Sequence, residues 1–217
     1  HMEHYLFVRK LLAWLAVPLN FNRMVAVGLR VFATLLVPLS LVTFFKAGKA
    51  LFDLPAEAIL GGVLFQMFYV IAIYAVVHTL FIRANDMDGL APTEHHIFPL
   101  ASVLAKAGGE ALAAYVALVA TGGGIYVWFT GKGIATVLNP PPRFLPVFGD
   151  SSFMGGIEFM VGGMFSALAI LITAYLASAL LSLLFTTADR SRLQHKTSGG
   201  VQESSEPALK MRSGTGS

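Results

Sequence analysis

The chain has 217 residues, of which 56% are hydrophobic and only 12% are charged, and its formal net charge is +3 at pH 7. An ordinary soluble domain carries about 25% charged residues, so this composition excludes a typical soluble globular protein and predicts a membrane protein. With no cysteine, the chain has no disulfide, thiolate metal site or cysteine nucleophile. The small positive charge gives no reason to expect a nucleic-acid partner.

The N-terminal segment, residues 3–22, is predicted to be an interfacial amphipathic helix. Its apolar stretch is too short to span a bilayer, and Arg9, Lys10 and Trp14 lie among its apolar residues. This mixture is typical of a helix lying at the membrane surface. A helix packed on the remainder of the protein is the alternative. Pro18 and the polar residues that follow predict its end.

Four apolar stretches come next, at about 24–45, 58–82, 111–130 and 157–186, within a membrane domain of residues 23–187. Each is long enough as a helix to cross the roughly 30 Å apolar core of a bilayer. Lipid cannot satisfy exposed backbone groups, and no segment alternates with the period of a barrel strand, so the spans should be helices. Residues 188–217 are rich in Ser, Gly and charge, which predicts a disordered tail.

The second and fourth stretches open with the same pattern, Glu-x-x-x-Gly-Gly. It is formed by Glu57, Gly61 and Gly62, and again by Glu158, Gly162 and Gly163. We therefore expect an all-α integral membrane protein, a four-transmembrane-helix bundle built from two parallel helix-hairpin repeats, with the interfacial helix in front. Parallel repeats occur in transporter halves.

The repeated pattern also predicts local roles. Glu57 and Glu158 fall at helix starts on the external side, where a carboxylate complements the helix dipole. Small residues let membrane helices approach closely, and the candidate packing residues are Gly61, Gly62, Gly162, Gly163, Ala113 and Ala117.

Lys and Arg residues set the expected orientation. Those between the first and second spans and between the third and fourth are Lys46, Lys49, Lys132 and Arg143. The N-terminal segment, the central loop and the tail together carry more. Because cytoplasmic loops are enriched in Lys and Arg, we expect a multi-pass protein of the inner (cytoplasmic) membrane with both termini in the cytoplasm.

Three ionisable residues fall inside or at the edge of the spans, all toward the cytoplasmic side: Arg30, His78 and Glu110. Ionisable groups at membrane depth are costly and are therefore functional candidates. One hypothesis is a polar cavity open to the cytoplasm, with Arg30 paired to Glu110 and His78 able to titrate. The alternative is that the charged groups reach the headgroups and His78 donates to a backbone carbonyl.

The central loop, residues 83–96, is rich in possible metal ligands, which are Asp86, Asp88, Glu94, His95 and His96. Carboxylate oxygens and imidazoles bind divalent metals. A structural explanation competes with this one, because Asp88-Gly89 is typical of a turn and Thr93-Glu94 of a helix start. We predict no other cofactor.

Three functional hypotheses remain open. The chain could be a non-catalytic membrane subunit, assembled with itself or with other membrane subunits through small-residue helix faces. It could be a small-solute or ion transporter or channel with Arg30, His78 and Glu110 along the path. It could be a membrane enzyme with a metal-dependent site in the loop at 86–96. The sequence favours the first, and favours a protein that is not an enzyme.

Overall fold

The computed structural model describes residues 18–90, 97–138 and 152–203, and the regular structure within these ranges is entirely helical. Four long helices are α2 (Pro18–Leu51), α3 (Ile59–Asp88), α4 (Ile97–Thr130) and α5 (Phe153–Glu203). Two short 3₁₀ helices, η1 (Ala56–Ala58) and η2 (Ile134–Thr136), lie in the connections before α3 and after α4.

All four long helices contain a segment that is long and apolar enough to cross a membrane: Phe21–Leu51, Ala56–Asp88, Leu100–Thr130 and Phe153–Leu184. These segments have 31 to 33 residues, whereas about 20 suffice for the apolar core of a bilayer. The helices therefore either tilt or extend into the interfacial region. An all-helical protein with four candidate spans is what the composition predicted.

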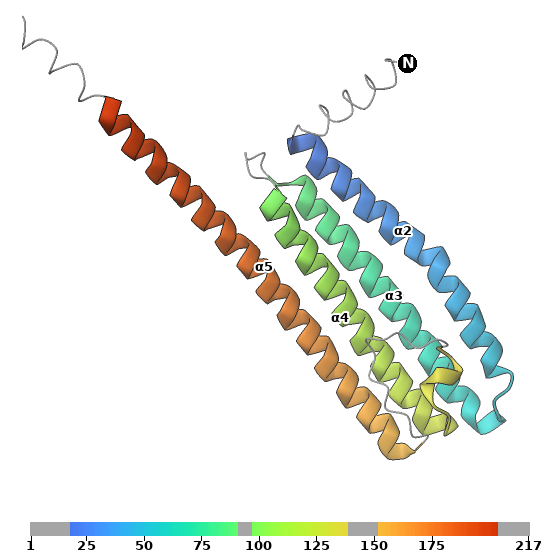
Figure 1. Cartoon of the computed structure of the whole chain (residues 1–217). Helices are drawn as coiled ribbons and strands as arrows, with labels where there is room; N and C mark the ends of the chain where they lie inside the picture. The colour runs from blue at the N-terminus through green and yellow to red at the C-terminus, as the bar shows by residue number, and fades with distance from the viewer. Residues whose placement is uncertain (1–17, 91–96, 139–151, 204–217) are drawn as a thin grey trace, which may run out of the picture.

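The helices form an open bundle in which they lie side by side in chain order (Figure 1). Extensive interfaces join α2 to α3, α3 to α4 and α4 to α5. In an apolar 18-residue stretch of each helix, 50% of α4 is buried inside the bundle, but only 11% of α2 and of α5. The two outer helices thus use one side for packing within the chain and leave the other side open.

Helix boundaries differ from the predicted ones in three places. Residues 18–22, expected to end an interfacial helix, form the first turns of α2, and Asn22 is buried on its packed side. Pro18 fits the first turn because an N–H there would have no helical acceptor. Residues 3–17 lie outside the described ranges.

The other two differences are extensions. The predicted central loop begins at residue 83, but α3 continues to Asp88, and α4 starts at Ile97, well before the predicted span. Likewise, α5 continues through residues 188–203, where composition predicts disorder. A helix that is already formed adds further turns without a new nucleation step, so polar ends can continue an apolar span.

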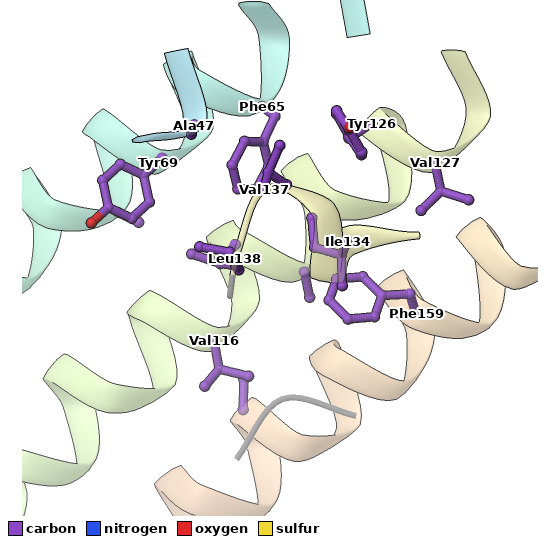
Figure 2. Packing of buried hydrophobic residues seen from close by; sticks show 14 of the residues in the cluster. Ala47, Phe65, Tyr69, Val116, Tyr126, Val127, Ile134, Val137, Leu138 and Phe159 are labelled. Atoms are coloured by element: carbon purple, nitrogen blue, oxygen red, sulfur yellow. The ribbon is translucent and has the colours of Figure 1, made fainter. Parts of the chain in front are cut away.

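The connection after α4 folds back onto the bundle. Gly131 has φ of 62°, a conformation that favours glycine, and it reverses the chain direction. Ile134, Val137 and Leu138 are then buried in one cluster with Phe65 of α3 and Phe159 of α5. Figure 2 shows these side chains converging around η2, which thus covers the space between α3, α4 and α5.

Candidate functional site: a polar network and an apolar groove

Arg83, Glu110 and Tyr175 connect α3, α4 and α5. Arg83 Nε donates to Glu110 Oε2 at 2.8 Å, and Arg83 Nη2 donates to the other carboxylate oxygen. The Tyr175 hydroxyl donates to Glu110 Oε1 at 2.7 Å. A two-point guanidinium–carboxylate contact is among the stronger hydrogen-bonded pairs. Lys106 of α4 lies over the ring of Tyr175, with its Nζ 5.6 Å from the ring centre.

Arg30 makes the corresponding connection between α2 and α3. Its Nη2 donates to Asn85 Oδ1 at 2.8 Å and forms an ion pair with Asp88. Asp86 also pairs with Arg83, within α3. We call these eight residues the polar network: Arg30, Arg83, Asn85, Asp86, Asp88, Lys106, Glu110 and Tyr175. Its members come from all four long helices, at the end of the bundle where α3 finishes and α4 begins.

The expected pairing of Arg30 with Glu110 is not the one observed. Arg30 pairs with Asp88, and Glu110 pairs with Arg83. The reason is the order of the helices: α2 packs on α3, and α4 packs on α3 from its other side. Each ion pair therefore forms within a contact of neighbouring helices, so the charges hold helices together.

His78 has a different environment from the other two candidates. It is exposed on α3 and stacks on Tyr74, with ring centroids 5.7 Å apart. Tyr74 itself is 68% exposed. The structure thus brings Arg30 and Glu110 into the polar network with partners of their own, and places His78 on an outward-facing stripe of α3.

The candidate metal ligands are only partly described. Asp86 pairs with Arg83 and Asp88 with Arg30, while Glu94, His95 and His96 lie outside the described residues. Across the described ranges no three His, Asp or Glu side chains gather in a way that would hold a metal ion. The two aspartates observed here act in ion pairs.

Three of the candidate packing residues, Gly61, Gly62 and Gly163, lie at close contacts between elements. A Cβ on Gly61 would be 2.4 Å from Phe129 Cβ, and one on Gly163 would be 2.0 Å from Ala120 Cβ. Gly62 faces Leu51 at the end of α2. Ala113 and Ala117 are in or against the central apolar cluster, and Gly162 is half-buried. The α4–α5 contact in particular depends on small residues.

The two glutamates at the opposite end are exposed. Glu57 belongs to η1, and Glu158 lies in the second turn of α5. Both are near a helix start, and neither has an ion-pair partner among the described residues.

An apolar groove of about 380 Å³ lies between α2, α3 and α4. Its floor includes Tyr69 and Val76 of α3, and its walls include Leu36 and Ser40 of α2 and Leu112 of α4. Tyr69 also belongs to the buried cluster that includes η2.

Sequence reasoning missed Arg83 and Tyr175 as members of a network. Arg83 was assigned to a loop, and Tyr175 falls within an apolar run. The Arg83–Glu110 contact depends on the register of α3 against α4, for which local sequence offers no signal. The hydroxyls of Ser102 and Ser178 lie 2.6 Å apart between α4 and α5. This contact could not be predicted either, because it depends on how each helix is rotated about its axis.

Comparisons with protein-family models, with curated proteins and with solved structures find no match to this chain.

Proposed function

We propose that the chain is a non-catalytic membrane subunit that assembles laterally, with copies of itself or with other membrane proteins, through the open side of an outer helix. The observation that carries this proposal is the open bundle. Only 11% of the apolar stretch of each outer helix, α2 and α5, is buried within the chain. Most of the surface of these two helices therefore remains for contacts outside the chain.

The charged residues support a structural role over a transport path. Arg30, Arg83 and Glu110 form ion pairs between neighbouring helices. His78 lies apart from them on an exposed stripe with Tyr74. A path for ions or polar solutes needs polar groups lining a common passage, whereas the groove between α2, α3 and α4 is apolar.

The outer side of α5 is the surface we propose for assembly. It presents large apolar side chains, among them Phe165 at 68% exposure, Ile172 at 58% and Leu176 at 59%. Lipid-facing helices are also apolar, and apolar surface alone does not drive association inside a bilayer. The test must therefore detect proximity of a second protein directly.

Because the chain has no cysteine, a single introduced cysteine is its only thiol and can be used for cross-linking in native membranes. Phe165→Cys places a thiol on the outer side of α5, and Ala167→Cys, two residues away and 7% exposed, places one against α4. We expect oxidation or a short bifunctional thiol reagent to cross-link the Phe165→Cys chain to a second protein, and to leave the Ala167→Cys chain as a monomer.

The identity of the product distinguishes the two forms of assembly. A product of twice the chain mass indicates a homo-oligomer, and a product that contains another protein indicates a subunit of a larger complex. If cysteines along the outer sides of both α5 and α2 yield only monomer, and native mass spectrometry of the mildly extracted protein also gives a monomer, the proposal is wrong.

A further inference from the structure

The apolar groove between α2, α3 and α4 has the dimensions and chemistry of a ligand site. Its volume of about 380 Å³ falls in the range of about 300–1,000 Å³ that is usual for small-molecule sites, which are mostly apolar with a few polar groups. Phe32 and Leu39, both on its rim, are 55% and 66% exposed. The groove is thus open on the side where a bilayer would surround the helices.

Local sequence explains why the space exists. On α4, Gly108 lines the groove, and a Cβ added there would have no atom within 4 Å. Ala111 beside it is also small. On α2, Pro38 interrupts the hydrogen-bond ladder because it has no N–H, close to the wall residues Leu36 and Ser40. Bulky residues at these positions of α4 would close the groove.

The polar groups of the groove are uncharged hydroxyls. Ser40, Thr43, Tyr69 and Tyr115 line it, and none of the described lining residues is Asp, Glu, Lys, Arg or His. The Ser40 hydroxyl donates to the carbonyl of Val37 at 2.7 Å, and the Tyr69 hydroxyl donates to the carbonyl of Ser40 at 3.3 Å. The Tyr69 oxygen also has a hydrogen bond with the Thr43 side chain. The Ser40 oxygen, whose proton is used by Val37, therefore remains as an acceptor for a ligand.

This arrangement selects among the molecules that a bilayer offers. A phosphate or carboxylate headgroup would lie in the groove without a cation, which is costly in an apolar site. A purely hydrocarbon molecule would fill the space but would not use the Ser40 oxygen. A neutral molecule with an apolar body and a hydroxyl group matches both the lining and the acceptor.

We propose that the groove binds a neutral lipophilic alcohol, which enters from the bilayer and donates its hydroxyl proton to the Ser40 oxygen. The proposal concerns the inner groove of one chain. It is independent of lateral assembly through the outer side of α5, and a monomer would retain it.

The test uses a photoreactive long-chain alcohol as the probe, with the purified full-length chain in lipid nanodiscs and labelled peptides mapped by mass spectrometry. We expect labelling on the groove-lining peptides of α2, α3 or α4, competed by unlabelled alcohol. Gly108→Phe should fill the groove and reduce this labelling about tenfold, a factor that corresponds to about 1.4 kcal/mol.

Gly28→Phe is the matched control, because Gly28 is also an exposed helical glycine with no atom within 4 Å of an added Cβ but does not line the groove. It should label as the wild type does. Circular dichroism and melting temperature check that both variants fold. Equal labelling of the two variants would overturn the proposal.

A second comparison tests recognition of the hydroxyl. Ser40→Ala should weaken labelling by the alcohol probe and leave labelling by the matched photoreactive hydrocarbon unchanged. If the hydrocarbon labels the wild-type groove as efficiently as the alcohol does, the site does not select an alcohol and the proposal is wrong.

Discussion

Glu110 is the acceptor through which three helices meet, since it receives hydrogen bonds from Arg83 of α3 and Tyr175 of α5 while belonging to α4. Its side chain is 19% exposed and that of Arg83 is 24% exposed. We expect Glu110→Gln to lower the free energy of unfolding by about 1–3 kcal/mol, because the half-buried Arg83 guanidinium then keeps only the more exposed Asp86 as a charged partner. Unfolding in a detergent titration, followed by circular dichroism, measures the loss.

Asp86→Asn provides the control at the same arginine. Asp86 also pairs with Arg83, but within one helix and with 45% of its side chain exposed. Exposed pairs of this kind contribute about 0.3–0.5 kcal/mol. Equal losses in the two variants would contradict the assignment of Glu110 as the residue that joins the helices.

At the scale of residues, the sequence drew attention to Arg30 and Glu110 but not to their partners. Arg30 and Glu110 could be recognised because ionisable groups are rare in spans. Their partners depend on which helices touch and how each is rotated, and nothing local encodes that. The partner of Arg30 is Asp88, a residue that the sequence suggested as a turn or a metal ligand.

At the scale of helices, α4 shows how two adjacent glycines can have opposite roles. A Cβ on Gly109 would be 2.0 Å from Ala174 Cβ, whereas a Cβ on Gly108 would have no atom within 4 Å. We expect Gly109→Ala to destabilise the protein by about 1–3 kcal/mol, because α4 and α5 must move apart to relieve overpacking. Gly108→Ala should be neutral or stabilising by up to about 1 kcal/mol, since Ala favours helix. Melting temperatures of the two variants in one detergent make the comparison.

Destabilisation by Gly108→Ala equal to that by Gly109→Ala would contradict the observed rotation of α4.

The sequence predicted that small residues pack helices, and it predicted four helices because runs of apolar residues determine spans. It also ended the spans too early, because apolar composition stops at the lipid boundary while the hydrogen-bond ladder of α4 and α5 extends beyond it.

At the scale of the whole molecule, the remaining prediction is orientation. The turn between α2 and α3 and the start of the connection after α4 lie at the same end, since Lys132 Nζ donates to the carbonyl of Asp53 at 3.4 Å. Gly89, after α3, is at the opposite end together with the polar network. The distribution of Lys and Arg favours a cytoplasmic location for the Gly89 end.

Single cysteines in the cysteine-free chain test this orientation in intact cells. Both Asp53 and Gly89 are exposed, so a thiol at either position should be accessible from its own side of the membrane. We expect a membrane-impermeant maleimide to label Asp53→Cys directly, and Gly89→Cys only after permeabilisation. The reverse pattern would place the polar network on the external side. Labelling of both from outside would show that α3 does not cross the membrane, which would contradict the four-span architecture itself, because Asp53 and Gly89 flank that helix.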